Sequence, residues 1–421
     1  NKDGMYNSFL GFETGSNNTD GNNNVFLGYQ PGFTNALGSF NVMLGYKAGY
    51  ASTLSYNTFL GYQAGTTNST GQYNAFMGYN AGISNTSGGS NVFIGNESGH
   101  TNMTGASNVF LGDSAGYSNT SSFNVFLGKG SGKTNSTGQY NAFMGYQAGF
   151  RNTGGESNVF IGNQAGRTNS TGGSNVFLGN LAGYLNSTGS FNVMLGYKAG
   201  YASTLSYNTF LGYQSGMANT TGQYNAFMGF DAGLSNTSGG SNVFIGNESG
   251  HTNQTGASNV FLGDSAGYWN TNSFNVFLGK GSGKANTTGQ YNAFMGYQAG
   301  FRNTGGASNV FIGNQAGRTN STGGSNVFLG NLAGYLNSTG SFNVMLGYKA
   351  GYASTLSYNT FLGYQSGMAN TTGQYNAFMG FDAGFSNTSG GSNVFIGNES
   401  GHSNITGASN VFLGDSAGYA N

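Results

Sequence analysis

The chain has 421 residues, of which 79 are Gly, 1 is Pro and none is Cys; only 6% are charged, and the formal net charge is zero. Such a chain has no long-range attraction for nucleic acid or for an acidic membrane surface, and none of its apolar runs is long enough to cross a bilayer. Its 34 Phe and 27 Tyr exclude a disordered chain, and its single Pro excludes collagen.

A five-residue motif, N-[VTAS]-[FM]-[LIM]-G, opens at Asn7 and recurs every 16 or 17 residues until Asn410. With this Asn numbered as position 0, Gly stands at +4 and +8 in every copy, and in most copies also at +14. Glycines at fixed offsets supply the positive φ angles that tight corners require. The period therefore predicts one turn of a solenoid, with two short strands and two tight turns per coil.

The coils are grouped in a second, longer period. After leading coils in 1–40, nine-coil super-repeats span 41–191, 192–342 and, incompletely, 343–421. We expect an all-β chain, a parallel β-solenoid of the β-roll or β-helix type with about 25 coils, continuous over 1–421. No helix is expected, because each interior Gly costs a helix about 1 kcal/mol relative to Ala. Since the last super-repeat is incomplete, we expect the sequence to be a segment of something longer.

Alternation along each strand assigns its side chains to two faces. We predict that Val at +1 and Leu or Ile at +3 fill the coil, which leaves the Phe at +2 pointing outward. A long Phe stripe needs cover, either within one chain or from other chains around a common axis. We favour a homo-oligomer, in particular a trimer, or else an end-to-end filament. The Phe residues expected to pack between chains include Phe59, Phe76, Phe93, Phe110, Phe126 and Phe143.

The pattern N-V-F-L-G-x-x-A-G resembles the S-V-A-I-G-x-x-S-x-A repeat of trimeric autotransporter adhesin heads. Similar N-T-F-I-G-x-x-A-G repeats occur in bacterial surface and phage-tail-like fibre proteins. The resemblance covers Asn7 to Gly418 and implies a left-handed parallel β-roll, a trimer and an extracellular or cell-surface location. This chain differs from the adhesin heads in its bulky Phe and in its slightly longer coils.

Catalytic and metal-binding groups are sparse. The three His residues, His100, His251 and His402, occupy one offset in successive super-repeats. Nine coils separate them, roughly 43 Å at the strand spacing, so no two can share a metal or a catalytic triad within one chain. We expect solvated turn residues at these positions. No enzyme activity, cofactor or metal is predicted.

Carboxylates recur in consecutive coils, as Glu97 and Asp113 do. Paired carboxylates can serve acid–base catalysis or bind Ca²⁺. In the next coil, however, a Lys occupies the same position as the Asp. The sequence therefore predicts inter-coil salt bridges between Asp113 and Lys129 and between Asp264 and Lys280.

Sequons of the form N-x-S/T recur at +11 and predict either glycosylation or ordinary polar turns. A glycan coat would hydrate a chain that carries so little charge. The candidate acceptors are Asn68, Asn85, Asn102, Asn119, Asn135, Asn169, Asn186, Asn219, Asn236, Asn253, Asn286, Asn320, Asn337, Asn370, Asn387 and Asn404. Further sequons begin at Asn17, Asn96, Asn247 and Asn398.

The pattern as a whole indicates an extracellular structural fibre or filament component. An adhesin head or shaft that binds a host or surface ligand is the first alternative. The partial Ser/Thr column at +12 and +13 leaves ice or polysaccharide binding as another. The single Trp, Trp269, lies in one super-repeat only and defines no site.

Overall fold

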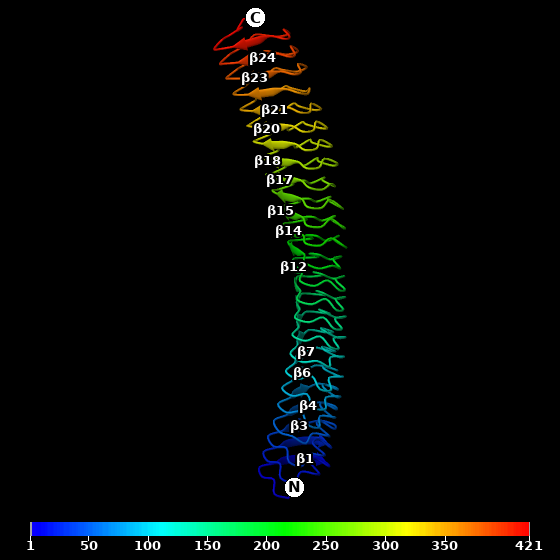
Figure 1. The fold of residues 1–421 in the computed structure, drawn as a ribbon. Coiled ribbons are helices and arrows are strands. Elements are labelled where there is room, and N and C mark those ends of the chain that lie inside the picture. The colour runs from blue at the N-terminus through cyan, green and yellow to red at the C-terminus, as the bar shows by residue number, and fades with distance from the viewer. Residues whose placement is uncertain (1, 421) are drawn as a thin grey trace. The chain divides into compact units, whose positions relative to one another are not determined.

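The computed structural model describes residues 2–420. The chain divides into two compact units, Asn1–Asn208 and Thr209–Asn421, and each is a stack of coils (Figure 1). Both units contain parallel β-strands, and residues 2–420 contain no helix. The all-β parallel solenoid predicted from the repeat is therefore confirmed. Each coil contains one strand and not the two that we expected, because turns and bends form the rest of the coil.

The strands of the first unit follow one another at the coil spacing. They are β1 (Ser8–Phe12), β2 (Val25–Tyr29), β3 (Val42–Leu44), β4 (Thr58–Leu60), β5 (Ala75–Met77), β6 (Val92–Ile94), β7 (Val109–Leu111), β8 (Val125–Leu127), β9 (Ala142–Met144), β10 (Val159–Ile161), β11 (Val176–Leu178) and β12 (Val193–Leu195).

The strands of the second unit continue the same pattern. They are β13 (Thr209–Leu211), β14 (Ala226–Met228), β15 (Val243–Ile245), β16 (Val260–Leu262), β17 (Val276–Leu278), β18 (Ala293–Met295), β19 (Val310–Ile312), β20 (Val327–Leu329), β21 (Val344–Leu346), β22 (Thr360–Leu362), β23 (Ala377–Met379), β24 (Val394–Ile396) and β25 (Val411–Leu413).

Within each unit, each strand pairs in parallel with the strand one coil further on, and like residues lie over like. In the second unit, for example, Phe244 pairs with Phe261. The 16-residue coils keep this register, since Val42 pairs with Thr58 across a shortened turn. Backbone hydrogen bonds continue between the turns, as from Gly99 N to Ala115 O at 3.0 Å.

The Phe at +2 points into the coil and not out of it. The side chains of Phe59, Phe76, Phe93, Phe110, Phe126 and Phe143 are all 0% exposed. Neighbouring rings stack face to face; the ring centroids of Phe93 and Phe110 are 4.8 Å apart and their planes differ by 5°. The prediction that these rings pack between chains is therefore wrong, because they are already buried by their own chain. The assignment from sequence had exchanged the inner and outer faces of the strand.

Glycine explains why the large ring, and not Val or Leu, lies inside. Gly99 at +8 faces the ring of Phe93 across the coil in a left-handed conformation, with φ of +59°. A Cβ on Gly99 would lie 2.6 Å from that ring. Because Gly at +8 has no side chain, it leaves space inside the coil that the Phe ring fills. Burial of a Phe ring also contributes more free energy than burial of Val.

Two columns of buried Asn complete the interior. The side-chain amide of Asn91, at position 0, donates to Gly105 O at 2.8 Å, and its oxygen accepts from Asn108 N at 3.0 Å. The amide of Asn102, at +11, donates to the same Gly105 O at 2.8 Å. Most coils are therefore closed by two side-chain hydrogen bonds to one carbonyl, and the buried amides are also linked to a neighbouring coil. In three coils Ser52, Ser203 or Ser354 replaces the +11 Asn.

Replacement of Gly99 by Ala should destabilise its coil by about 2–4 kcal/mol, because the new methyl group meets a ring and the backbone is left-handed. Gly154→Ala is the matched control, since its Cβ would meet only the Thr137 hydroxyl, at 3.3 Å. Hydrogen exchange of the peptide amides in residues 91–116 measures the loss. Equal protection in both variants would contradict the packing described.

Candidate functional site

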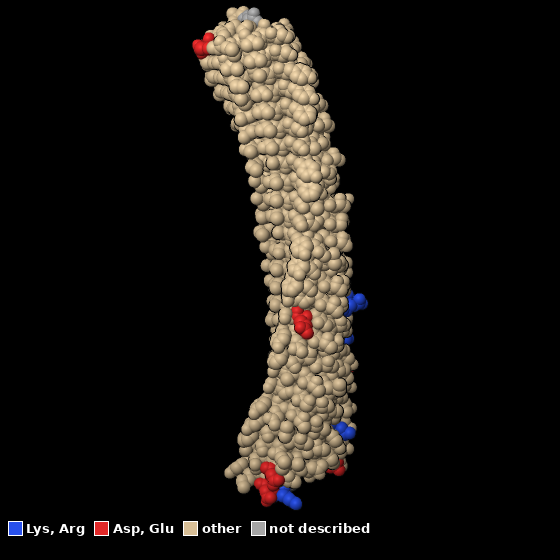
Figure 2. All heavy atoms as spheres, in the orientation of Figure 1, with Lys and Arg blue, Asp and Glu red and all other residues tan. Residues whose placement is uncertain are grey.

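No cluster of three or more His, Cys, Asp or Glu able to hold a metal is found within the part of the chain that the structure describes. The same residues include no helix long and apolar enough to span a membrane. Charged side chains are few on the face shown in Figure 2, which is formed almost entirely by uncharged residues. The features that could carry function are therefore columns of like residues on the coil surface.

The sequon asparagines at +11 are part of the core. Asn68, Asn85, Asn102 and the others of this column are at most 1% exposed. The amide of Asn102 donates to Asn85 Oδ1 at 3.1 Å, while its oxygen accepts from the Asn119 amide at 3.2 Å. An amide nitrogen held in this way is not open to a glycan in the folded coil. Burial of the column argues against glycans on the folded coil, and glycosylation at these positions stays a prediction.

The remaining sequons lie on the surface. Asn17, Asn96, Asn247 and Asn398 are all exposed. The amide of Asn96 donates to Asp113 Oδ1 at 3.3 Å, a contact made at the surface. These four positions are the ones at which a glycan would meet no steric obstacle from the coil interior.

Both inter-coil ion pairs are present. Lys129 Nζ lies 3.1 Å from Asp113 Oδ2, and Lys280 Nζ lies 3.0 Å from Asp264 Oδ2. The hydrogen bond from Lys129 holds the pKa of Asp113 below its ordinary value, with smaller contributions from the Asn96 and Ser114 side chains. Because both partners are well exposed, each pair contributes little to stability.

The His side chains stack on the next coil instead of standing free in solvent. The ring centroids of His100 and Tyr117 are 4.6 Å apart, and those of His251 and Tyr268 are 4.7 Å apart. Each His is half-buried. The expectation of a fully solvated turn His is corrected by this stacking, which gives the residue a structural role.

Asp231 is half-buried, and no counter-ion is in hydrogen-bonding contact with it. Its Oδ1 atom is buried and has no hydrogen-bond partner. Desolvation raises the pKa of Asp231; nearby His251 opposes this shift and Glu248 adds to it. Asp382 has the same raised pKa in the following super-repeat, whereas the equivalent residue in the first unit is the uncharged Asn80.

Two apolar columns run along the outer face of the strands. The +3 residues are partly exposed, as shown by Met77 at 41% and Ile161 at 38%. Beside them, Tyr at +5 forms short stacks; Tyr62 and Tyr79 have ring centroids 5.2 Å apart and are 44% and 51% exposed. We call the +1, +3 and +5 side chains the outer stripe. Its +1 and +3 side chains are the ones that our assignment of faces had placed inside.

A second exposed aromatic column lies at the last position of many coils, which is +16 in the 17-residue coils and +15 in the 16-residue coils. It contains stacks of two or three rings, such as Phe40, Tyr56 and Tyr73, with centroids 5.3 and 5.1 Å apart. Each ring sits on a left-handed backbone, with φ of +65° at Tyr56. The same conformation occurs where the coil ends in Ser, with φ of +57° at Ser157, so it belongs to the turn and not to the ring. We call these residues the +16 column.

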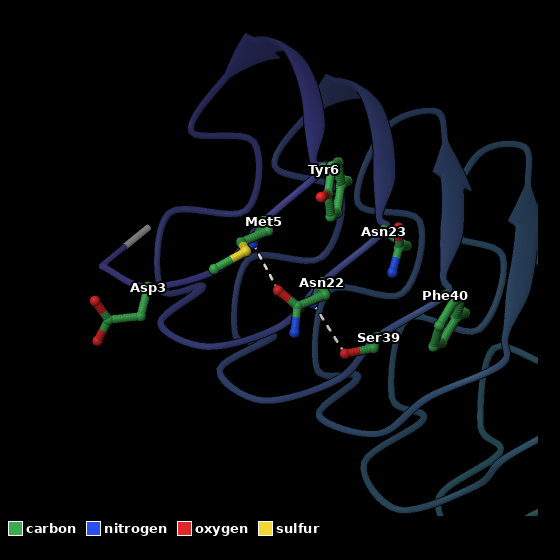
Figure 3. A pocket seen from close by; sticks show the side chains of 7 residues that line it. All are labelled: Asp3, Met5, Tyr6, Asn22, Asn23, Ser39 and Phe40. Atoms are coloured by element: carbon green, nitrogen blue, oxygen red, sulfur yellow. Dashed lines mark hydrogen bonds between the residues drawn. The ribbon is translucent and has the colours of Figure 1, made fainter.

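Two hollows of the first unit lie where the +16 column is interrupted. In Figure 3, Asn23 occupies the place of a ring between Tyr6 and Phe40, and the hollow of about 340 Å³ is also lined by Met5 and Ser39. In the second hollow, also about 340 Å³, Ser replaces the ring in two successive coils. It is lined by Glu156, Ser157, Thr171, Ser174, Ser190 and Phe191.

Sequence reasoning missed the +16 column. The signal was present, because aromatic residues alternate with pairs of Ser at one offset throughout the chain. A comparison of the chain with protein-family models and with curated proteins finds no match. The parallel solenoid agrees with the fold that the adhesin-head resemblance implies, while the trimer and the handedness stay predictions.

Replacement of Asn102 by Asp should destabilise its coil by about 3 kcal/mol or more, because a buried carboxylate would face Asn85 Oδ1 and Gly105 O. Asn163→Asp is the matched control, since that exposed residue stands at +5, where Asp113 occurs naturally. Thermal unfolding followed by circular dichroism compares the two. Equal stability would show that the +11 amides are not buried donors.

Replacement of Asp231 by Asn should stabilise the chain near neutral pH, because it removes the desolvated charge and reproduces Asn80. The raised pKa means that the folded state favours the protonated acid, so the wild-type penalty is relieved as pH falls through that pKa towards the ordinary value of 3.8. Unfolding midpoints against pH should therefore converge in acid. The Asp113→Asn substitution should instead lower stability near neutral pH. The pKa of Asp113 is lowered in the folded chain, so the stability that its carboxylate contributes is lost in acid. A wild type more stable than the Asp231 variant at pH 7 would contradict this account.

Proposed function

We propose that this chain is a structural segment of an extracellular fibre, built by coil stacking and extended by association between chains. The observation that carries the proposal is the repetition itself. Most coils bury the same Phe, Asn and Gly columns, and Met and Ser replace Phe and Asn in the coils that open at Asn41, Asn192 and Asn343. Each coil bonds chiefly to its immediate neighbours, so that stability grows with each added coil. Such a design suits reach and strength better than a single catalytic centre.

The outer stripe supports association between copies of the chain. It combines partly exposed Leu, Ile and Met at +3 with Tyr at +5, in register from coil to coil. Contiguous apolar surface of this kind typically marks a protein–protein interface. Because a second copy carries the same columns at the same spacing, two stripes can interdigitate along many coils. A closed homo-oligomer such as a trimer would cover the stripe on every chain.

A surface location accords with the composition. The chain has no Cys and little charge, so its hydration depends on Asn, Ser and Thr in the turns. Any glycan on this fibre belongs at the exposed sequons, of which Asn96 and Asn247 are examples. Mass spectrometry of native material would therefore find glycopeptides there and not at the buried +11 column.

Replacement of the +3 residue by Lys in alternate coils, beginning with Met77→Lys, Leu111→Lys and Met144→Lys, should abolish association while the coils remain folded. Like charges about 10 Å apart along the stripe repel a second stripe of the same kind. Sedimentation equilibrium measures the assembly state, and electron cryomicroscopy shows whether the wild-type chain forms filaments.

The control carries the same number of Lys residues at the exposed +13 position, as in Thr70→Lys, Thr104→Lys and Thr137→Lys. It should assemble as the wild type does. A wild-type chain that stays monomeric at high concentration would refute the fibre proposal. Assembly that survives the +3 substitutions would move the interface to another face.

A further inference from the structure

We infer that the gaps in the +16 column are repeated binding slots for neutral sugars, each of which accepts pyranose rings in place of the missing aromatic rings. The inference concerns a surface distinct from the outer stripe and does not require that the chain form a fibre. It rests on the spacing of the column, on the free ring faces at each gap and on the hydroxyl groups between them.

The column spacing sets the thickness of the slots. Stacked rings at +16 lie just over 5 Å apart, as in Phe123 and Tyr140 at 5.2 Å. One missing ring, as at Asn23, leaves about 10 Å between the flanking ring planes, and two missing rings leave about 15 Å. A pyranose ring centred between rungs of this kind lies about 5 Å from each neighbour, within the range of aromatic-face contacts. The slots therefore hold one or two sugar rings.

The ring faces that border the gaps are open. Tyr358, between Phe342 and Tyr375 in one stack, is 48% exposed, while Tyr375 at the end of that stack is 59% exposed. Tyr140, which precedes the gap at Ser157, is likewise 59% exposed. The additional exposure at the stack ends is the ring face that a neighbouring rung would otherwise cover. Each gap thus presents an aromatic face to a ligand.

Polar groups line the second hollow beside the ring of Phe191. Ser157, Thr171 and Ser174 are exposed. Ser190 Oγ accepts a hydrogen bond from Gly173 N at 3.0 Å, which leaves its own hydroxyl hydrogen free to be donated. A sugar presents C–H groups on its faces and hydroxyls around its edge, so it matches both aromatic walls and a hydroxyl-lined floor. A flat aromatic ligand would stack on the rings but would leave the hydroxyl groups without hydrogen bonds.

The charge pattern favours neutral sugars. Glu156 is the only charged residue that lines the Ser157–Ser174 hollow. The corresponding residue one super-repeat later is Ala307, and the gap at Ser90 and Ser107 has Gly89 and Ala106 in this position. Asp3 lines the hollow at Asn23, so each of the two hollows has one carboxylate at its edge. No Lys or Arg lines either hollow, so neither selects an anionic sugar. Several equivalent slots on one chain would bind a polysaccharide with high avidity.

The test fills the slots with residues that the column already contains. Ser157, Ser174 and the rings that flank them share one backbone conformation, with φ between +55° and +58°. Ser157→Tyr with Ser174→Phe therefore completes the stack without new backbone strain. In the filled chain this pair of changes is repeated at all five Ser pairs, and Asn23→Tyr closes the single gap.

Isothermal titration with cellohexaose measures the affinity and the number of sites on the full chain. The wild type should bind at several sites, and the filled chain should bind at least about tenfold more weakly, equivalent to about 1.4 kcal/mol. Ser157→Tyr with Ser174→Phe alone should lower the number of sites by one. Tyr146→Ser, a change in the +5 column at similar exposure, should leave binding unchanged.

Filling the slots adds aromatic surface, so non-specific adsorption to aromatic groups predicts stronger binding by the filled chain. Unchanged or stronger binding would therefore overturn the inference. So would the absence of saturable binding by the folded wild type up to ~10 mM cellohexaose. Circular dichroism of each variant verifies that the coils are intact.

Discussion

Within each unit, the in-register parallel pairing of each coil with the next is the interaction on which the rest of the structure depends. Parallel pairing at a spacing of about 4.8 Å places every residue over its equivalent in the neighbouring coil. Any side chain at a given offset must therefore be able to stack on itself. Phe can do so through its ring faces, Asn through amide hydrogen bonds that run in one direction from coil to coil, and Gly through the absence of a side chain. The strict composition of the repeat follows from this requirement.

Pairing also determines which positions of the coil tolerate substitution. The interior columns at 0, +2, +8, +11 and +14 hardly vary, because one altered member would disturb two neighbours. The surface offsets are free to differ, and they carry the ion pairs, the stacked His and the gaps in the +16 column. Both functional proposals therefore concern columns and their interruptions. This is why the outer stripe and the sugar slots are both patterns along the stack.

The period, the strand positions, the absence of helices in the described chain and the pairs Asp113–Lys129 and Asp264–Lys280 could be predicted, because they depend only on spacing. The orientation of the strand could not, since both of its faces are apolar and alternation alone does not say which is inside. The burial of Asn102 could not be predicted, because N-x-S/T is also a common sequence of exposed turns. The +16 hollows could not be predicted without knowing that rings at one offset stack on each other and that a missing ring leaves space.

The central claim is that a single chain encloses its own aromatic core and leaves the other face of each strand outward. The chain has no Cys, so single cysteines report on each face without interference. On β21, Met345 is 0% exposed and its neighbour Leu346 is 36% exposed. The decisive measurement is thiol labelling of Met345→Cys and Leu346→Cys at a concentration where the chain is monomeric. The account predicts rapid labelling at 346 and labelling at 345 only after unfolding; the reverse order would contradict it.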